Sequence, residues 1–469
     1  MKVPLIITLL MHLFAGSVHA QPMLRAGAYA MNIDPEKFPV PAVGLMTPRE
    51  ATKVHDPLHA RCLVIDNGET VIAFAIVDSC MVPREIWDDA KKRVTETVGI
   101  PASRILGSAT HTHSAVCVTP GFQTDPDKDY QELLKERIAL GIIEAYRRLE
   151  PARIGWSLGN NAVHVNNRRW FMRDGYSFID PLGQGTDQVQ MNPPAGGTSL
   201  AKPAGPTDPE VPIISVQSLE GRPIAFLANY SLHYVGGVPA EYLSADYFGA
   251  FARHIGDLLG ADADFVGIMT NGTSADINNT NFFEPRNRKE PFEQIERVAE
   301  DIALAAKLAH DRIVYQDWVP IQMEERQISL GVRKPTDSEL RRAKMTLAGA
   351  GEEPYTDRAL IYTRESVFLA DYPDEVMVKL QALRIGDLGI VATPTETFVE
   401  TGLDIKKASP FKPTFVIELA NGYNGYLPTI EQHQLGGYET WRARSSYLAV
   451  SAEPKVRRQL LEMLNQVAE

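Results

Sequence analysis

The chain has 469 residues, of which 44% are hydrophobic and 23% are charged, so it has the composition of a globular protein with a sizeable core. Its formal net charge is −12 and no basic cluster stands out, which excludes nucleic acid as an expected partner. The length fits two or three domains, but it also fits one large α/β domain.

The first twenty residues have the pattern of a secretory signal peptide. Lys2 supplies a short positive region, residues 5–16 are apolar with one exception, and residues 18–20 (Val-His-Ala) fit a small-residue cleavage site. The alternative is a buried N-terminal helix. The apolar stretch is too short to anchor the chain in a bilayer, and the mature chain from Gln21 contains no predicted membrane span. We therefore expect export, either to the periplasm or out of the cell, with cleavage after Ala20.

The chain has three cysteines, Cys62, Cys80 and Cys117. At most one disulfide can form among them, and one thiol is left over. No Cys-x-x-Cys pair is present, which excludes a structural zinc site of the finger type. Stability is therefore expected to come from the hydrophobic core.

Strand-like and helix-like segments alternate along the first third of the chain. Residues 70–78 form a continuous apolar run that is typical of a strand buried on both faces. The segments predicted here are strands at 24–35, 60–66, 70–78 and 105–109, and helices at 83–98 and 130–149. This alternation predicts an α/β fold, with a large mixed β-sheet flanked by helices.

The rest of the chain continues this pattern, and two segments depart from it. The predicted strands are 224–229, 265–269, 378–385, 388–392 and 415–419, and the predicted helices are 245–259, 291–311 and 454–467. Residues 181–211 are rich in Gly, Pro, Gln and Asn, which predicts a long surface excursion, either a lid or pocket wall or a passive loop. Residues 335–375 are charged and helix-prone, and they are expected to form an inserted helical subdomain.

Two histidines follow the predicted strand at 105–109. His111 and His113 stand two residues apart, and residues i and i+2 of an extended segment point to the same face. Neutral imidazole is the commonest protein ligand for zinc. The pair is therefore predicted to bind a metal or to act in catalysis, and the alternative is two solvated loop histidines.

Further polar or metal-capable side chains also follow strand-like runs. They are His233, Asp276, Glu396, Tyr423 and Tyr426. Open sheets bind ligands beyond the ends of their strands, and two histidines from different strands with a carboxylate make a catalytic zinc set. Such a site lowers the pKa of a bound water to roughly 7 and polarises a carbonyl oxygen. The spacing therefore indicates a metal-dependent hydrolase, without fixing its substrate.

Six segments resemble, in the same order, the motifs of the neutral, non-lysosomal ceramidases. They are Ser-Ala-Thr-His-Thr-His-Ser at 108–114, Asn-Arg at 167–168, Asn-Tyr-Ser-Leu-His at 229–233, Pro-Thr-Glu at 394–396, Tyr-Asn-Gly-Tyr-Leu-Pro-Thr at 423–429 and Tyr-Glu at 438–439. The resemblance spans roughly residues 24–445. It implies that residues 21–469 form a ceramidase-like catalytic domain without the C-terminal immunoglobulin-like domain of that family.

The resemblance also implies a set of site residues and a reaction. The implied zinc ligands are His111, His233, Glu396 and Tyr426. The residues implied to face the substrate or to lie behind the ligands are His113, Arg168 and Tyr438. The implied reaction is amide hydrolysis by a zinc-activated water, with these groups stabilising the tetrahedral oxyanion. The expected substrate is an N-acyl amide, with ceramide as one candidate, and a lipid substrate would involve a peripheral contact with a membrane surface.

One family motif is altered in this chain. The family carries Gly-Asn/Asp-x-Ser-Pro-Asn with a serine required for activity, and this motif aligns with Ala-Asp-Ile-Asn-Asn at 275–279. Asp276 keeps the acidic position, Asn278 replaces the serine, and Ser274 is close but out of register. Asp276 and Asn278 are therefore candidate site residues, and the natural substrate is expected to differ from that of the family.

Three other interpretations remain open. One is a metal-dependent amidase or esterase with a substrate other than ceramide. Another is an amidohydrolase barrel that uses the His-x-His pair, although eight regular strand–helix units are not found. The third is a carbohydrate- or lipid-binding relative that has lost turnover, because Asn278 replaces the serine.

Overall fold

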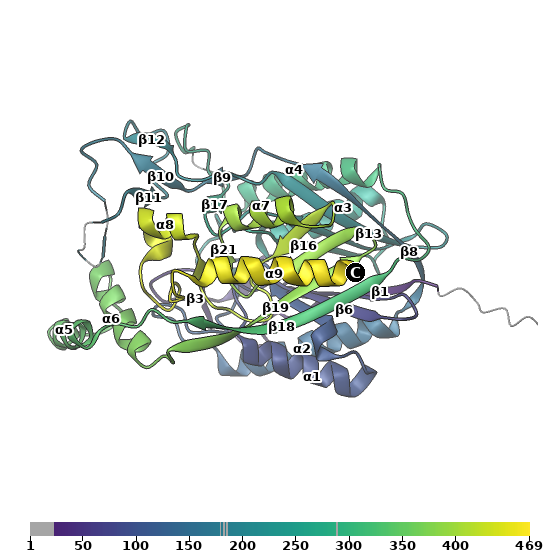
Figure 1. Cartoon of the computed structure of the whole chain (residues 1–469), viewed down its shortest axis with the longest axis horizontal. Coiled ribbons are helices and arrows are strands. Elements are labelled where there is room, and N and C mark those ends of the chain that lie inside the picture. The colour runs from purple at the N-terminus through teal and green to yellow at the C-terminus, as the bar shows by residue number, and fades with distance from the viewer. Residues whose placement is uncertain (1–22, 179, 182, 184–185, 288) are drawn as a thin grey trace, which may run out of the picture.

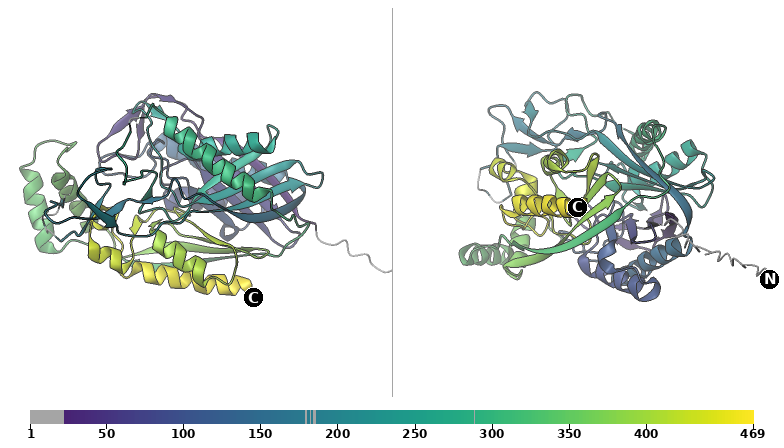
Figure 2. Two further views of the ribbon diagram at one scale, coloured as in Figure 1. Left: turned by 90° about the horizontal axis from the view of Figure 1, so that it is seen from above. Right: turned by 45° about the vertical axis from the view of Figure 1, so that its right-hand side comes forward.

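Two β-sheets packed face to face form the centre of the computed structural model, with helices on both outer sides (Figures 1 and 2). The structure describes residues 23–178, 180–181, 183, 186–287 and 289–469. The predicted signal peptide at 1–20 lies outside these residues. In the part of the chain that is described, no helix is long and apolar enough to cross a membrane.

The larger sheet has eight strands of mixed direction. In spatial order they are β16 (Val266–Asn271), β14 (Pro223–Tyr230), β13 (Glu210–Ser218), β8 (Glu150–Asn160), β1 (Arg25–Asn32), β5 (His59–Asp66), β6 (Val71–Val77) and β7 (Ile105–Ala109). Parallel pairs lie at the two edges, β14 with β16 and β6 with β7, and the other neighbours are antiparallel. The predicted large mixed sheet is confirmed, and an amidohydrolase barrel, which needs a closed ring of parallel strands, is excluded.

The smaller sheet has four strands, β18 (Ile321–Gly331), β19 (Glu375–Ile385), β20 (Leu388–Ala392) and β22 (Thr414–Ile417). The first three are antiparallel, and β20 pairs with β22 in parallel. The hairpin of β19 and β20 turns at Gly386 and Asp387, as the sequence predicts, and Gly386 has the left-handed φ of 58° that such a turn requires.

The hydrophobic core follows from the alternation of side chains along the strands. In β6, Ile72, Phe74 and Ile76 face the smaller sheet, and the alternate residues Ala73, Ala75 and Val77 face the helices. All six are almost completely buried, so the predicted strand with two buried faces is confirmed. Each large apolar side chain buried in this way stabilises the fold by about 1.5–3 kcal/mol.

Helices cover the outer face of each sheet. The larger sheet is covered by α1 (Arg84–Val98), α2 (Lys128–Arg147), α3 (Asp246–Leu259) and α4 (Glu293–His310), and the smaller sheet by α7 (Val399–Ala408) and α9 (Ala452–Ala468). The apolar stripe of α4 is buried against the strands through Ile295, Val298, Ile302 and Ala306, at the three-and-four spacing seen in the sequence.

The larger sheet curls, so that its two edges approach each other. The strand at one edge, β16, contacts β5, β6 and β7 near the other edge. Residues after β22 bridge the remaining gap: the amide of Glu418 donates to the carbonyl of Asn271 at 3.2 Å, and the amide of Ala109 donates to the carbonyl of Leu419 at 3.2 Å. Residues that follow β7 and β14 therefore come together despite their distance in the strand order.

A pair of helices, α5 (Asp337–Ala348) and α6 (Arg358–Ala370), is inserted between β18 and β19 and lies at one end of the molecule (Figure 1). The helical prediction for 335–375 agrees with these bounds. α5 begins with a capping box in which Thr336 and Glu339 each bind the backbone of the other. Whether the pair is a separate subdomain stays a prediction.

The prediction of an irregular excursion at 181–211 is partly wrong. β11 (Val189–Met191) and β12 (Leu200–Pro203) flank β10 (Arg169–Met172) in a three-stranded sheet. This order comes from pairing with a distant strand, which local composition does not reveal. Among the described residues of 181–211, none lines the cavity of the candidate site, so these residues do not form its wall.

The remaining elements are short. They are β2 (Val40–Ala42), β3 (Arg49–Ala51), β4 (Lys53–Val54), β9 (Asn166–Asn167), β15 (Tyr242–Leu243), β17 (Ile277–Asn278), β21 (Glu396–Thr397), β23 (Tyr426–Leu427), α8 (Ile430–Leu435), and the 3-10 turns η1 (Ala102–Arg104) and η2 (Tyr438–Thr440). Cys62, Cys80 and Cys117 are all buried and free, so the chain is held by its core and not by disulfides.

Candidate metal centre

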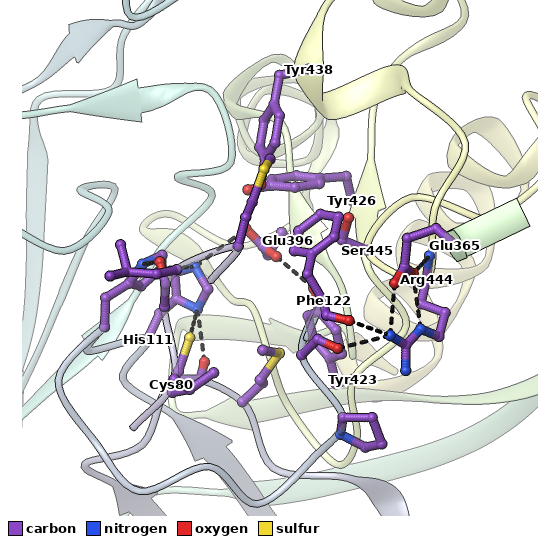
Figure 3. A pocket seen from close by; sticks show the side chains of 18 residues that line it. Cys80, His111, Phe122, Glu365, Glu396, Tyr423, Tyr426, Tyr438, Arg444 and Ser445 are labelled. Carbon is purple, nitrogen blue, oxygen red and sulfur yellow. Dashed lines mark hydrogen bonds and ion pairs between the residues drawn. The ribbon is translucent and has the colours of Figure 1, made fainter. Parts of the chain in front are cut away.

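Three strand ends deliver metal-capable side chains to one point. His111 lies two residues beyond β7, His233 three residues beyond β14, and Glu396 four residues beyond β20. Each of these strands has a parallel neighbour, and the ends of parallel strands are common ligand sites. Figure 3 shows His111 and Glu396 facing each other across the pocket.

The ligand atoms of these residues are close together and buried. The Nε2 atom of His111 is 3.0 Å from Nε2 of His233, 3.2 Å from Nε2 of His113 and 3.3 Å from Oε2 of Glu396. Nε2 of His233 is 3.8 Å from the same Glu396 oxygen. His111, His233 and Glu396 are at most 2% exposed. These spacings suit ligands that share one ion at about 2.0–2.2 Å each.

Backbone carbonyls fix the orientation of all three imidazole rings. Nδ1 of His111 donates to the carbonyl of Cys80 at 2.7 Å, Nδ1 of His113 to that of Gly44 at 3.1 Å, and Nδ1 of His233 to that of Ser274 at 3.1 Å. Because a carbonyl only accepts, each Nδ1 is assigned the proton, and each neutral ring then presents an Nε2 lone pair. Three lone pairs about 3 Å apart repel one another unless a cation lies among them, so the set fits a metal ion.

The backbone around the first two histidines is shaped for this arrangement. His111 has a left-handed φ of 73°, a conformation that costs a non-glycine residue on the order of 1–2 kcal/mol and that clusters at functional sites. Gly44 has a φ of 110°, and a Cβ atom on it would lie 2.6 Å from Cβ of His113. A glycine is therefore required where this carbonyl meets the His113 ring.

The charge state of the cluster favours one positive charge at its centre. Burial lowers the pKa of His113 and of His233 well below the usual value, which keeps both rings neutral and able to bind a metal. Burial also acts to lower the pKa of His111, but attraction to Cys80 and Glu396 outweighs it and raises the pKa well above the usual value. A proton or a metal ion is thus stabilised beside Glu396.

Glu396 offers one uncommitted oxygen to that centre. Its Oε1 accepts a hydrogen bond from the Tyr423 hydroxyl at 2.9 Å, whereas its buried Oε2 lacks a hydrogen-bond partner among the described residues and faces the histidines. Burial acts to raise the pKa of Glu396, but His111, Arg168 and Tyr426 outweigh it and hold the pKa below its usual value. A buried, ionised oxygen without a donor is a further sign that the residues fit a cation.

Tyr426 lies next to Glu396 because two short strands pair. β21 and β23 are parallel, with Glu396 opposite Tyr426. The Tyr426 hydroxyl therefore lies beside Glu396, and it accepts a hydrogen bond from Nη2 of Arg168 at 3.2 Å. α7 begins only at Val399, because the backbone of Glu396 is committed to this strand pair.

Arg168 reaches the site on a buried ion-pair network. Its Nε donates to Oε1 of Glu439 at 2.9 Å, and Nη1 of Arg169 donates to Oε2 of the same carboxylate at 2.6 Å. Burial acts to lower the pKa of Arg168, but Tyr426 and Glu439 outweigh it and raise the pKa, so the guanidinium stays charged. Glu439 thus pairs with two buried cations and fixes the position of Arg168.

A narrow cavity of about 100 Å³ opens onto the cluster (Figure 3). Its lining includes His111, His113, Glu396, Tyr423, Tyr426 and Tyr438, apolar side chains from Val43, Leu45, Met46, Met81 and Phe122, and the ion pair of Glu365 with Arg444. Tyr438 packs edge-to-face against Tyr426, with ring centroids 5.8 Å apart. A cavity of this size holds the atoms around a reacting bond and not a whole lipid.

The two residues of the altered motif lie outside this cavity. Asp276 is fully buried: its Oδ1 accepts from the amide of Val399 at 2.9 Å, at the start of α7, and its Oδ2 accepts from Nδ2 of Asn167 at 2.7 Å. Asn278 donates to the side chain of Asn192. Neither residue lines the cavity, so Asp276 positions α7 and the segment before Arg168.

Two solved structures similar to this chain are ceramidases. The crystal structure of the neutral ceramidase from Pseudomonas aeruginosa aligns over 95% of this chain and 74% of its own, with a TM-score of 0.70 and 16% sequence identity. A ceramidase complexed with C2 aligns over 95% of this chain and 75% of its own, with a TM-score of 0.71 and 14% identity. The chain has the neutral ceramidase fold. Neither a family model nor a curated protein matches the sequence.

Within this ceramidase fold, several residues around the cluster escaped the sequence analysis. Tyr234 stacks on the ring of His113 at a centroid distance of 3.7 Å, and Sγ of Cys80 lies 3.6 Å from Nδ1 of His111. Tyr234 directly follows His233, and this adjacency was the one feature of the sequence that could have indicated its place in the site. Glu439 and Glu418 also belong here, and both act through partners that are distant in the sequence.

Proposed function

We propose that this protein is a zinc-dependent hydrolase that cleaves an amide bond of the N-acyl type. The observation that carries the proposal is the convergence of His111, His233 and Glu396, whose facing ligand atoms lie 3.0–3.8 Å apart at the base of a cavity. The ceramidase fold adds support, because the two similar solved structures are named as ceramidases.

The residues proposed to hold zinc are His111, His233, Glu396 and Tyr426. When bound, zinc supplies a Lewis acid for a carbonyl oxygen and a water nucleophile at neutral pH. The neutral imidazoles present their lone pairs without rearrangement, and Glu396 compensates part of the positive charge. The Tyr426 hydroxyl lies beside Glu396 and adds an oxygen donor on the same side.

His113 is proposed to move a proton. Its Nδ1 is fixed by the Gly44 carbonyl, and its ring is held by the stacked Tyr234, so its Nε2 points at the cluster with a free lone pair. A neutral imidazole in this position accepts a proton from the attacking water and returns it to the leaving amine nitrogen. The low pKa that burial gives to His113 favours the neutral form that this step needs.

Arg168 and Tyr438 are proposed to stabilise the charge that develops on the carbonyl oxygen. Arg168 is charged, buried and anchored by Glu439, so it needs little reorganisation during the reaction. Tyr438 lines the cavity, and burial raises its pKa, which preserves the hydroxyl as a donor. Preorganised donors of this kind are usually the largest single contribution to catalysis of acyl transfer.

The apolar side chains of the cavity favour a substrate with an apolar group beside the reacting bond. Ceramide is one candidate among N-acyl amides, and a lipid substrate would be reached by peripheral contact with a membrane surface. Export, proposed from residues 1–20, would place this activity in the periplasm or outside the cell.

Metal analysis and a substrate panel test the proposal directly. Purified protein should contain about one equivalent of zinc, and a chelator should abolish hydrolysis of N-acyl amides in a panel that also includes esters. His111→Ala and Glu396→Ala should lose both zinc and activity. His254→Ala is the matched control, because His254 on α3 pairs with Glu296 and does not line the cavity. Activity that persists without metal would refute the proposal.

A second candidate is a ligand-binding protein that keeps the metal without turnover. It is favoured by one observation, Asn278 at the position of the family's serine. Stoichiometric zinc with no hydrolysis across the whole panel would support this candidate over the enzyme.

A further inference from the structure

Glu418 is a buried carboxyl group that the proposed reaction does not use. It follows β22 directly and is 0% exposed. Its Oε1 accepts from the hydroxyl of Ser274 at 2.7 Å, and its Oε2 accepts from the backbone amide of Thr397 at 2.7 Å. Burying a carboxyl group is costly unless its oxygens are hydrogen-bonded, and here both are.

Each oxygen of Glu418 reaches a segment that either anchors or carries a proposed ligand. The carbonyl of Ser274 is the group that fixes Nδ1 of His233, at 3.1 Å. Thr397 is the residue after Glu396, in the two-residue strand β21. The two hydrogen bonds therefore tie the anchor of the His233 ring and the backbone of Glu396 to a single side chain.

The backbone carbonyls of Glu418 and Leu419 also contact the segment that carries His111. The carbonyl of Glu418 accepts from the hydroxyl of Ser108 at 2.9 Å, and the carbonyl of Leu419 accepts from the amide of Ala109 at 3.2 Å. Ala109 lies two residues before His111. Residues 418–419 thus contact the segments of all three facing ligands, at the place where the edges of the larger sheet meet the smaller sheet.

We propose that Glu418 is a positioning residue for the metal centre, which fixes His233 and Glu396 relative to each other in the arrangement that accepts the ion. The proposal rests on the proposed function only in requiring that an ion binds there. Without the carboxyl group, the hydroxyl of Ser274 and the amide of Thr397 lose buried partners, and both segments are free to shift. Partners that orient metal ligands in this way typically change metal affinity by about 10–100-fold when they are lost.

The contacts of Glu418 imply that it supports the metal centre by holding segments in place and not by its negative charge. Burial raises the pKa of Glu418 to about 8, which favours the protonated form in the metal-free chain and leaves little charge beside Glu396. In that form Oε1 donates to the Ser274 oxygen, and Oε2 still accepts from Thr397. A glutamine can keep both contacts: its carbonyl accepts from Thr397, and its amide group donates to the Ser274 oxygen. Glu418→Gln should therefore retain the function that Glu418→Ala loses.

The test is the zinc affinity of the metal-free full chain, measured by competition with a chromophoric chelator. Glu418→Ala should bind zinc about 10–100-fold more weakly, and Glu418→Gln within about 3-fold of the wild type. Ser274→Ala keeps the carbonyl that holds His233 but removes the hydroxyl, which contacts Glu418 at 2.7 Å and Nδ1 of His233 at 3.5 Å, and it should lose about 3–10-fold. The matched control is Glu453→Ala, which removes another buried carboxyl group, bonded to Thr401 and Arg457, and should leave the affinity within 2-fold.

The outcomes separate this proposal from the proposed function. Wild-type zinc affinity in a folded Glu418→Ala protein overturns the positioning role alone. Should that variant fail to fold, unchanged affinity in Ser274→Ala overturns it equally. The positioning role is also contradicted if Glu418→Gln loses as much zinc affinity as Glu418→Ala. In that case the charge of Glu418, and not its contacts, would support zinc binding. A wild type that binds no zinc overturns both proposals, whereas zinc binding without hydrolysis leaves the role of Glu418 intact.

Discussion

The two sheets supply chemically different halves of the candidate centre. The proposed nitrogen ligands, His111 and His233, follow strands of the larger sheet, and the proposed oxygen ligands, Glu396 and Tyr426, follow strands of the smaller sheet. The nitrogen half is fixed ring by ring, since each imidazole has its own backbone carbonyl. The oxygen half is fixed through side chains that bind one another. A substitution in the nitrogen half should therefore affect only the residue replaced, whereas a substitution in the oxygen half should also displace its neighbours.

Removing one ring from the nitrogen half should give the largest single effect. His111→Ala takes away the nitrogen that lies closest to all the others, and it should abolish zinc binding and lower kcat/KM by about 10³-fold or more, or about 4 kcal/mol of transition-state stabilisation. The fold should survive, because the backbone carbonyls that held the ring can bind water. Zinc content and the circular dichroism spectrum check this, with His254→Ala as control. A variant that unfolds would contradict the local nature of this half.

Breaking the network behind the oxygen half should show damage that spreads. Glu439→Gln leaves Arg168 and Arg169 to compete for one amide oxygen in a fully buried position. Breaking a buried ion pair typically costs about 3–5 kcal/mol of stability, and a displaced Arg168 should lower kcat by about 10–100-fold. Thermal melting and steady-state kinetics measure the two effects. If kcat falls while stability is unchanged, Glu439 is not the structural link described here.

The same contrast explains how far the sequence could predict the molecule. Local patterns revealed the strand at 70–78, the helices and the His111–His113 pair, because each depends on neighbours along the chain. The contacts of Glu418 and Glu439 stayed hidden, since Ser274 lies 144 residues from Glu418 and Arg168 lies 271 residues from Glu439. The strands within 181–211 were missed for the same reason, as they pair with β10. Asp276 was found by alignment, but only its contacts reveal that it anchors α7.

The folding stability of the metal-free protein should depend on pH through Glu418, which lies between the two halves. In the folded state burial raises the pKa of Glu418 from 4.5 to about 8, so between these values the native chain holds a proton that the unfolded chain has released. This contribution to stability is fully present below pH 4.5 and is lost as the pH rises toward 8. Chemical denaturation from pH 5 to 8 should show wild type losing about 3–4 kcal/mol relative to Glu418→Gln. Parallel curves for the two proteins would show that this group does not titrate in that range.

A smaller effect is expected from one hydrogen bond within the oxygen half. Tyr423→Phe removes the hydroxyl that donates to Oε1 of Glu396 and leaves the ring in place. The lost bond should cost about 1 kcal/mol, and zinc affinity should fall by about 5-fold, because Glu396 gains freedom to turn away from the histidines. Competition with a chelator measures this, and Tyr447→Phe, whose hydroxyl accepts from Asn424, is a matched control outside the centre. Equal losses in both variants would mean that Tyr423 does not act through Glu396.

The smallest effect is expected at the position where the sequence departs most from the ceramidase motif. Asn278 belongs to neither half: it donates to Asn192 and lies outside the residues that line the cavity. Asn278→Ser restores the family's residue, yet from this position a hydroxyl has no route to the cluster, so kcat/KM on N-acyl amides should change by less than about 2-fold. A rise of 10-fold or more would show that the segment at 276–280 moves toward the cavity when substrate binds. A segment outside both halves would then contribute to the centre, and the division between the two sheets would no longer describe the whole site.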